Sequence, residues 1–417
     1  MGAAFSGLTL RGRFLLVTGL ALAAASLALS QRDLLRVALF LVALPLVAML
    51  VVSRTRYRLT CGRVLEPSRV PAGVAATVLL RLENVSRLPS GVLLMEDALP
   101  YALGRRPRFV LDRVPPGITR EVRYRARADV RGRYQVGPLV VRLTDPFGLS
   151  RVTRSFSSVD ELVVTPAVTP LPRIRLGGDW ATGGDTSSRA LATSGSDDAT
   201  TREYRHGDDL RKVHWRSTAR MGELMVRQEE HRLQSRATVL LDGRAGAHRG
   251  EGPGSSFEWA VSAAASIAVS LAQQGFGLRV LADTGQDLVP HPGPVSEGVV
   301  LEVLAGVGTS KSTVLTPAVT QLRQSGLEGA LVAVLGLLSA HDTDELVRLR
   351  QGSGRCVAVL IDAGTWTARH GPRGDAEQSA RRLEAAGWRV LRISHGTTLA
   401  AVWPLAGVHG PTVGVSG

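Results

Sequence analysis

Two apolar segments near the start of the chain constrain its fold more than any other feature. Phe14–Ser30 and Leu34–Val52 each approach the length that an α-helix needs to cross the core of a bilayer. Only three residues lie between them, so the pattern predicts a tight transmembrane hairpin within residues 1–56. A cleaved signal peptide is the alternative for the first segment, but a second span follows at once and no clear small-x-small site precedes a soluble start.

The arginines that flank the two segments predict their orientation. Arg11 and Arg13 precede the first segment, and Arg54, Arg56 and Arg58 follow the second. Because positively charged flanks stay on the cytoplasmic side, both ends of the hairpin and everything after residue 55 are expected in the cytoplasm. The sequence therefore predicts a multi-pass protein of the plasma membrane, with the lipid bilayer as its first partner.

The formal net charge of +14 comes almost wholly from arginine, since Lys212 and Lys311 are the lysines. An excess of this sign can indicate nucleic acid or an anionic membrane surface as a partner. The arginines are scattered along the chain instead of forming a stripe, which favours a compositional bias and no nucleic-acid partner. Cys61 and Cys356 lie far apart, each in a strand-like run, which argues against a disulfide framework or a cysteine-based metal site.

Residues 57–169 show the pattern of a β-rich domain. Apolar residues alternate with smaller or polar ones, and the turn signals ENVS, VPPG, VRGR and DPFG fall between short runs. Many short strands with little helical periodicity predict an immunoglobulin-like β-sandwich, acting as a spacer or docking platform near the membrane. Residues 170–200 are rich in Gly, Ser, Thr and Asp, a composition that predicts a flexible linker.

After residue 236 the pattern changes to apolar strands that alternate with amphipathic helices. This alternation predicts an α/β domain over residues 236–417, with a mostly parallel, Rossmann-type sheet covered by helices on both faces. In such sheets the ligand site lies at the carboxyl ends of the strands. The predicted strands are Ala237–Leu241, Leu278–Ala282, Ala330–Leu335, Cys356–Ile361 and Trp388–Ile393, and the predicted helices are Phe257–Gln274, Glu297–Ala305, Thr343–Arg350 and Ala376–Ala386.

The segment Thr201–Gln228, called here the signature segment, mixes Arg, His, Trp, Tyr and paired Asp more densely than the rest of the chain. Asp208 or Asp209 is placed to cap a short helix that runs to about Arg220 and ends at Gly222. A strand is expected to follow this helix and to lead into the α/β domain.

Two functions are open to the signature segment. Asp208, Asp209 and His214 could form a hydrolytic centre by acid–base or metal-assisted chemistry. Alternatively, the arginines, tryptophan and carboxylates form a charged clasp on the sheet or a docking surface for a partner. No further catalytic group lies near these residues in the sequence, so the interaction surface is favoured.

These residues carry a family resemblance. The signature segment resembles that of the family called domain of unknown function 58 (DUF58), with Glu-Tyr, Gly-Asp-Asp, His-Trp and Gly-Glu-Leu in this order ahead of an α/β region. The DPFGL run at Asp145–Leu149 resembles a second feature of that family. Leu224 completes the Gly-Glu-Leu match. The expected interaction residues, within an arm spanning residues 201–235, are Glu203, Tyr204, Gly207, Asp208, Asp209, His214, Trp215, Gly222 and Glu223.

The resemblance implies a C-terminal domain like the von Willebrand factor A fold. It also implies association with MoxR-type AAA+ ATPases and occurrence beside transglutaminase-like membrane proteins. We therefore expect a membrane-anchored scaffold, not an enzyme, that works with such an ATPase in the assembly or remodelling of membrane or envelope complexes.

A working A-type metal site needs Asp-x-Ser-x-Ser after the first strand, a Thr in a later loop and an Asp after a middle strand, because hard cations prefer oxygen ligands. Asp242 is present, but both serines are missing and Arg244 adds a positive charge. Thr309 could stand for the later Thr, and no Asp directly follows the strand at Ala330–Leu335. The sequence thus predicts a degenerate site with no metal or cofactor, and a metal-dependent ligand-binding module is the alternative.

His341, Asp342 and Asp344 could also suggest a transition-metal site. Isolated His and Asp residues at the start of a helix are more often solvated caps, and we expect that role here.

Overall fold

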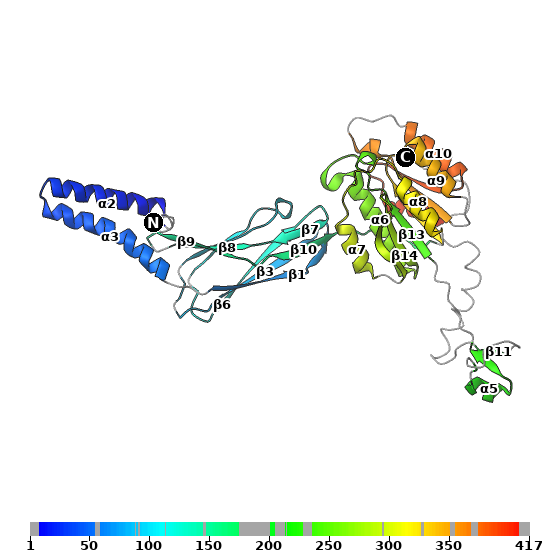
Figure 1. Cartoon of the computed structure of the whole chain (residues 1–417), viewed down its shortest axis with the longest axis horizontal. Helices are drawn as coiled ribbons and strands as arrows, with labels where there is room; N and C mark the ends of the chain where they lie inside the picture. The colour runs from blue at the N-terminus through cyan, green and yellow to red at the C-terminus, as the bar shows by residue number, and fades with distance from the viewer. Residues whose placement is uncertain are drawn as a thin grey trace. The chain divides into compact units, whose positions relative to one another are not determined.

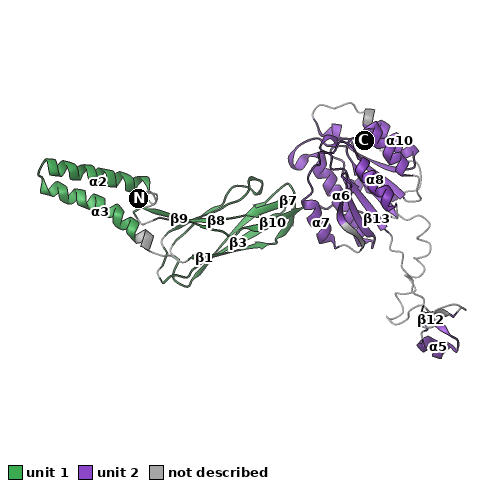
Figure 2. Ribbon diagram, in the orientation of Figure 1, with its two compact units in different colours: residues 1–167 green, residues 168–417 purple. Residues whose placement is uncertain are grey.

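The structure is a computed structural model that describes residues 8–54, 59–87, 89–90, 92–112, 114–144, 147–174, 201–204, 213, 215–227, 236–293, 296–326, 329–350, 355–367 and 374–407. The chain divides into two compact units, residues 1–167 and 168–417, which are coloured separately in Figure 2.

Unit 1 begins with the predicted pair of apolar helices, α2 (Leu10–Ala28) and α3 (Arg32–Arg54), which lie side by side in Figure 1. Both are long and apolar enough to cross a membrane by length and composition. Small residues of α2 recur every seventh position and are buried, namely Gly12, Gly19 and Ser26. A Cβ atom on Gly19 would lie 2.8 Å from a methyl carbon of Val42 on α3. The two helices therefore pack closely through small residues, as helices in membranes commonly do.

The rest of unit 1 is the predicted β-rich domain, built from sheets with the strand orders β1-β3-β6, β2-β10-β7 and β5-β4-β8-β9. Strand β3 shows how the sequence specifies it, since Ala76, Val78, Leu80 and Leu82 alternate along the strand and are all fully buried. Buried residues from the three sheets form one hydrophobic core. The strands are β1 (Leu59–Glu66), β2 (Arg69–Pro71), β3 (Ala75–Asn84), β4 (Leu93–Asp97), β5 (Arg108–Leu111), β6 (Thr119–Arg127), β7 (Gly132–Val136), β8 (Leu139–Thr144), β9 (Arg151–Phe156) and β10 (Asp160–Thr165).

Unit 2 contains a six-stranded sheet with the order β15-β14-β13-β16-β17-β18. Neighbouring strands are parallel except for β15, which pairs with β14 in the antiparallel direction at the edge. This is the doubly wound order: β14 and β15 are added on one side of β13, and β16, β17 and β18 are added on the other. The strand order therefore reverses between β13 and β16. The strands are β13 (Arg236–Leu241), β14 (Gly277–Ala282), β15 (Asp287–Gly293), β16 (Ala330–Leu335), β17 (Arg355–Ile361) and β18 (Arg389–Ile393).

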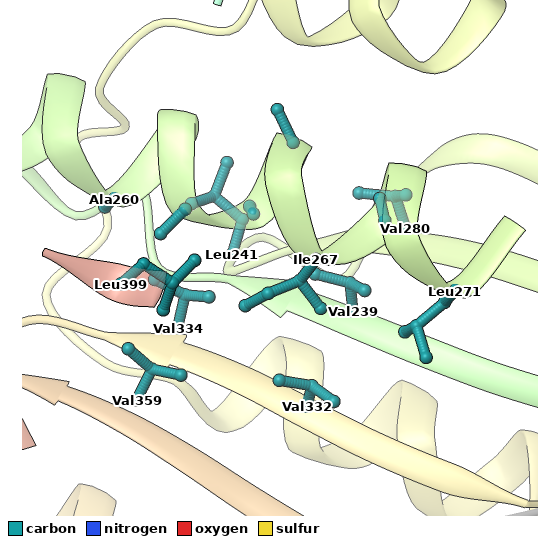
Figure 3. Close-up of a cluster of buried hydrophobic side chains, with 14 of the residues drawn as sticks. Val239, Leu241, Ala260, Ile267, Leu271, Val280, Val332, Val334, Val359 and Leu399 are labelled. Carbon is teal, nitrogen blue, oxygen red and sulfur yellow. The ribbon is translucent and has the colours of Figure 1, made fainter. Parts of the chain in front are cut away.

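Helices cover both faces of this sheet because its strands are apolar on both sides. Val239 and Leu241 pack into one core with Ile267 and Leu271 of α6, as Figure 3 shows. Leu240, between them in β13, packs into a second core with α8, α9 and α10. The helices are α6 (Ser256–Gln273), α7 (Glu297–Ala305), α8 (Thr316–Ser325), α9 (Ala340–Leu349), α10 (Gly374–Ala385) and α11 (Leu399–Val402).

Strand β15 and helix α8 are two of the elements of unit 2 that the sequence does not predict. Strand β15 contains Pro290 and Pro292, which lack a backbone N–H and are more typical of a loop than of a strand. An edge strand tolerates them because it pairs on one side only. Helix α8 buries only Ala318, Val319 and Leu322, and this short apolar stripe gives a weak helical pattern.

Candidate functional site

A buried ion cluster lies at the carboxyl edge of the six-stranded sheet, beside the point where its strand order reverses. Asp242 follows β13 directly, and Arg244 comes next but one in the same loop. The Asp242 carboxylate accepts hydrogen bonds from Arg244 Nε and Nη2, both at 2.9 Å, and from the N–H of Gly336 at 3.1 Å. The side chains of Asp242 and Arg244 are 0% and 4% exposed, so this ion pair is shielded from water.

Arg244 also binds a second buried carboxylate. Its Nη1 donates to Asp342 Oδ2 at 2.8 Å and to the carbonyl of Thr313 at 3.3 Å, and its Nη2 also donates to the carbonyl of Leu337 at 3.1 Å. All five N–H groups of the guanidinium therefore have acceptors. Burial lowers the pKa of Arg244, but Asp242 and Asp342 outweigh burial and hold that pKa above its ordinary value. The side chain is a permanent cation between two carboxylates.

Asp342 is positioned by the start of α9. It forms a capping box with Ser339, whose hydroxyl and N–H both donate to the carboxylate, and the N–H of Leu315 donates to it at 3.0 Å. Burial raises the pKa of Asp342, but these hydrogen bonds and the charge of Arg244 outweigh burial and hold the pKa below its ordinary value. Asp342 is thus an anion at neutral pH.

A third buried carboxylate, Asp283, follows β14 and braces the Asp242 loop. It accepts from the N–H of Gly243 at 3.1 Å and from the hydroxyl of Ser310. A Cβ atom on Gly243 would lie 2.6 Å from Asp283 Oδ1, so the close approach requires glycine. The loop that carries Ser310 runs alongside the Asp242 loop, with a parallel bridge between Arg244 and Ser310.

His248 closes the other side of the loop. Its Nε2 lies 2.8 Å from the carbonyl of Asp242, and its Nδ1 lies 3.2 Å from the hydroxyl of Ser256. Burial lowers the pKa of His248 below its ordinary value, which keeps the ring neutral at pH 7. A neutral ring that donates from Nε2 to a carbonyl and accepts at Nδ1 satisfies this geometry, so His248 acts as a structural brace.

Arg244 and Asp342 line a pocket of about 380 Å³. Lys311, Ser312 and Thr313 contribute an ammonium group and hydroxyls on one side, and Ser339 lies at the start of α9. Within the described ranges, no three His, Cys, Asp or Glu side chains group in a way that could hold a metal ion. At this edge the positive charge between the carboxylates comes from Arg244.

Two expectations for this edge are wrong. Thr309 does not enter the site: it is exposed, and Ser310, the next residue, bonds to Asp283. Asp342 is a helix cap as expected, but it is fully buried and not solvated, because Arg244 reaches it across the loop. The spacing of Ser339 and Asp342 gives the capping-box signal in the sequence, whereas nothing local signals the burial.

The described part of the signature segment consists of a two-stranded sheet and a short helix. Strand β11 (Thr201–Glu203) pairs with β12 (Met225–Arg227) in the antiparallel direction, and α5 (Trp215–Met221) precedes β12. The N–H of Tyr204 donates to the carbonyl of Leu224 at 2.8 Å. Gly222 adopts φ +78°, which fits the predicted end of the helix. The predicted strand at β12 forms its sheet with β11, separate from the six-stranded sheet.

The pairing of β11 with β12 brings the first and last motifs of the segment together, since Glu203 lies opposite Met225 and Tyr204 bonds to Leu224. Trp215 is 71% exposed, and Gly222 and Glu223 are exposed as well. The remaining predicted interaction residues lie outside the described residues: Gly207, Asp208, Asp209 and His214.

Sequence reasoning missed a buried polar cluster in unit 1. Arg63 on β1 donates to Asp97 at 2.6 Å and to Asp160 at 3.0 Å, and the hydroxyl of Tyr124 donates to Asp97 at 2.6 Å. The side chains of Arg63 and Asp97 are 2% and 0% exposed. Burial raises the pKa of Tyr124 above its ordinary value, so the hydroxyl stays protonated. These contacts link four strands or their ends, which points to a structural role.

The comparisons with known proteins bear on unit 2. Residues 200–363 match the family model described as "Protein of unknown function DUF58". The match supports the DUF58 family. It spans the signature segment and the strands from β13 to β17, which include the Asp242 loop and Asp342. No curated protein matches the chain in sequence.

Several solved structures are similar to parts of the chain. The CARDB domain of the PF1109 protein from Pyrococcus furiosus has 9% identity and a TM-score of 0.20, over 26% of this chain and 93% of that one. The putative ApaA protein from Bordetella pertussis has 12% identity and a TM-score of 0.21, over 26% and 94%. Cwp6 from Clostridium difficile has 7% identity and a TM-score of 0.19, over 80% and 45%. At these values the similarities carry no argument about function.

Proposed function

We propose that this DUF58 chain is a membrane-anchored interaction protein whose α/β domain binds its partners without a metal ion. The observation that carries the proposal is the position of Arg244, whose guanidinium lies between the buried carboxylates of Asp242 and Asp342. A hard divalent cation would need those same oxygens. To bind there it would have to displace a cation that makes hydrogen bonds through all five of its N–H groups. The proposal assigns no catalytic role to the chain.

We infer further that the α/β domain is of the von Willebrand factor A type. The strand order of unit 2, with one antiparallel edge strand, supports this inference, as does an aspartate directly after the central strand β13. The family resemblance of the signature segment implies the same fold. In that fold the Asp242 loop is the metal-binding loop, and here Arg244 takes the place of the metal.

The metal-independent site is tested by calorimetry of the full chain in detergent, titrated with magnesium or manganese. We expect no saturable heat of binding from the wild-type protein. Binding that saturates in the wild type and is lost in Asp242→Ala would overturn the proposal in favour of a metal-dependent ligand-binding module.

We propose that α2 and α3 anchor the protein in the plasma membrane and that the β-rich domain of unit 1 and the whole of unit 2 face the cytoplasm. The apolar length of the two helices supports this orientation, as do Arg11 and Arg13 in the first turn of α2 and the arginines Arg54, Arg56 and Arg58 at and after the end of α3. In intact spheroplasts, an externally added protease should spare the β-rich domain and unit 2, whereas lysed spheroplasts should show rapid cleavage. Cleavage in intact spheroplasts would contradict the orientation.

We propose a MoxR-type AAA+ ATPase as the partner, with a role in assembling or remodelling membrane or envelope complexes. The support is the resemblance of the signature segment and the exposure of Trp215, since exposed tryptophans are frequent binding hot spots. A transglutaminase-like membrane protein is a second expected component of such a complex.

Affinity purification from membranes tests the partner. The wild-type chain should recover the ATPase, and a variant with both His214→Ala and Trp215→Ala should recover at least about tenfold less, as expected for loss of a hot spot. Tyr101→Ala is the matched control, because Tyr101 is a 99% exposed aromatic residue of unit 1. Absence of the ATPase from every sample would refute the partner, and equal recovery from all variants would refute the role of the signature segment. Ester or phosphodiester turnover lost in His214→Ala would instead favour the hydrolase alternative.

A further inference from the structure

Gly148, Leu149 and Ser150, which lead into β9, are bonded to the start of α2. The N–H of Thr9 donates to the carbonyl of Leu149 at 2.9 Å, and the Thr9 hydroxyl donates to the carbonyl of Gly148 at 2.6 Å. Leu8 and Ser150 form an antiparallel bridge. Figure 1 shows β9 beside this end of α2. Backbone groups at the end of the β-rich domain are thus tied to the first turn of an apolar helix.

The contact is too close to be incidental. A Cβ atom on Gly12 of α2 would lie 2.3 Å from the carbonyl oxygen of Leu149, a distance that a side chain cannot adopt. Leu149 is 3% exposed, and Gly148 adopts φ +71°, a left-handed conformation that favours glycine. The residues Gly148 and Leu149 therefore hold the β-rich domain against the start of α2.

These contacts also fix the position of Phe147 along the axis of α2. The exposed apolar surface of α2 starts directly after Thr9, with Leu10 at 85% and Phe14 at 73% exposed. Phe147 immediately precedes Gly148, which accepts from Thr9, and its side chain is 65% exposed. Phe147 therefore lies level with the beginning of the surface that a bilayer would cover.

Two arginine side chains lie near the same position along α2. Arg11 in the first turn of α2 and Arg151 at the first position of β9 are both exposed. The Arg11 Nη1 atom lies 3.9 Å from the position that a Cβ atom would take on Gly148, so this guanidinium lies beside the loop. An aromatic ring at the boundary of the apolar region, with arginines beside it, is the arrangement that fits a membrane–water interface. The charge is complementary to an anionic lipid surface.

We propose that the described part of the β8–β9 loop, from Phe147 to Ser150, is an interfacial membrane contact. In it the ring of Phe147 inserts at the boundary of headgroups and acyl chains, while Arg11 and Arg151 bind anionic phospholipid headgroups. The proposal rests on membrane anchoring by α2 and α3. It goes beyond the proposed function, because it assigns a lipid contact to the β-rich domain and makes that domain a fixed platform at the membrane surface.

The test places an environment-sensitive dye on single cysteines in the full chain. Cys61 and Cys356 are first replaced by alanine. Cysteine is then introduced by Phe147→Cys, by Leu20→Cys in the middle of α2, or by Tyr101→Cys. Tyr101 is the matched control: it is 99% exposed and follows β4, at the end of the β5-β4-β8-β9 sheet opposite the β8–β9 loop. Each labelled protein is reconstituted into vesicles of phosphatidylcholine and phosphatidylglycerol that contain nitroxide lipids.

We expect deep nitroxides to quench the dye at position 20, shallow nitroxides to quench it at position 147, and neither to quench it at position 101. Quenching at position 147 should fall by at least about twofold in vesicles of phosphatidylcholine alone, and also after Arg151→Gln.

The outcomes separate the two ideas. If position 20 is quenched but position 147 behaves like position 101, the loop contact is refuted and the anchor stands. If position 20 is not quenched, the anchor itself is refuted. If quenching at position 147 is the same in both lipid mixtures and in Arg151→Gln, the binding of anionic headgroups is refuted. Iodide in the aqueous phase provides a second measurement, since it should quench position 101 more strongly than position 147.

Discussion

Replacing Arg244 with methionine should destabilise unit 2 by about 3–5 kcal/mol at neutral pH, the cost of removing one partner from a buried ion pair. The Arg244 side chain is 4% exposed, and the carboxylates of Asp242 and Asp342 on either side are 0% exposed. Methionine fills most of the volume of the arginine stem, so little of the loss comes from a cavity. The cost arises because two anions remain buried without their cation.

Two further variants identify the cause of the loss. Arg249→Met is the matched control, because Arg249 lies in the same region but is exposed, and its side chain donates to the backbone carbonyls of Gly246 and His248. We expect Arg249→Met to cost less than about 1 kcal/mol. Adding Asp242→Asn and Asp342→Asn to Arg244→Met removes both orphaned charges, and this triple variant should be more stable than Arg244→Met alone.

The six tryptophans make the assay specific, because all of them follow residue 167 and therefore report on unit 2. Urea unfolding of the full chain in detergent, followed by tryptophan fluorescence, gives the midpoint of the transition. With a slope of about 1–3 kcal/mol per molar urea, the predicted loss lowers the midpoint by more than about 1 M. A midpoint for Arg244→Met no lower than that of Arg249→Met would refute this reasoning, as would a triple variant less stable than the single one.

The same variant predicts a pH dependence. Burial alone would raise the pKa of Asp342, and in the wild type hydrogen bonds and Arg244 hold it below the ordinary value. A folded-state pKa below the unfolded value contributes stability above the unfolded pKa, which is lost as the pH falls through the folded pKa. Without Arg244 that contribution shrinks, so the difference in stability between wild type and Arg244→Met should be largest at pH 7. It should narrow below about pH 4, where the unfolded carboxyl is protonated. A difference that stays constant over this range would contradict the electrostatic cause.

Three further predictions follow from other parts of the structure. Burial raises the pKa of the Cys356 thiol to about 11, so a maleimide at pH 8 should modify this residue only after unfolding, as mass spectrometry would show; rapid native modification would contradict it. Gly19→Leu should force α2 away from Val42 and make the hairpin more sensitive to protease in detergent than Leu20→Ala, and equal sensitivity would refute the close packing. Tyr124→Phe removes the hydroxyl that donates to a buried oxygen of Asp97 at 2.6 Å, and it should lower the stability of unit 1 by about 1–3 kcal/mol. Hydrogen exchange of the amides in β3 and β6 measures this loss, and unchanged exchange would count against the prediction.

The sequence predicts those parts of the fold whose physics is local. The apolar runs give the two helices of unit 1, and continuous apolar stretches coincide with β13, β14, β16, β17 and β18, since a strand buried on both faces must be apolar throughout. Strand β15 is different, because two prolines conceal it and only pairing with β14 makes it a strand. A strand that forms only through pairing with its neighbour cannot be predicted from its own residues.

The candidate site likewise has features that the sequence indicates and contacts that it does not. The missing serines and the positive charge of Arg244 indicate, from the sequence alone, that the Asp242 loop departs from a metal site. The partnership between Arg244 and Asp342 joins residues 98 positions apart, and no local pattern encodes it. Ser310 is missed for a similar reason, because the parallel bridge to Arg244 decides which residue of its loop faces Asp283.

A cation that belongs to the chain has consequences that a bound metal does not. A metal can keep a coordination position open for an acidic group of a partner, and it can be removed or exchanged. Arg244 has no donor left for such a group, since its five N–H groups already bind Asp242, Asp342 and two carbonyls. Any partner at this edge must therefore contact the surrounding groups, among them Lys311 and the hydroxyls of Ser312 and Thr313 that line the pocket. Binding at this edge should then be insensitive to chelators.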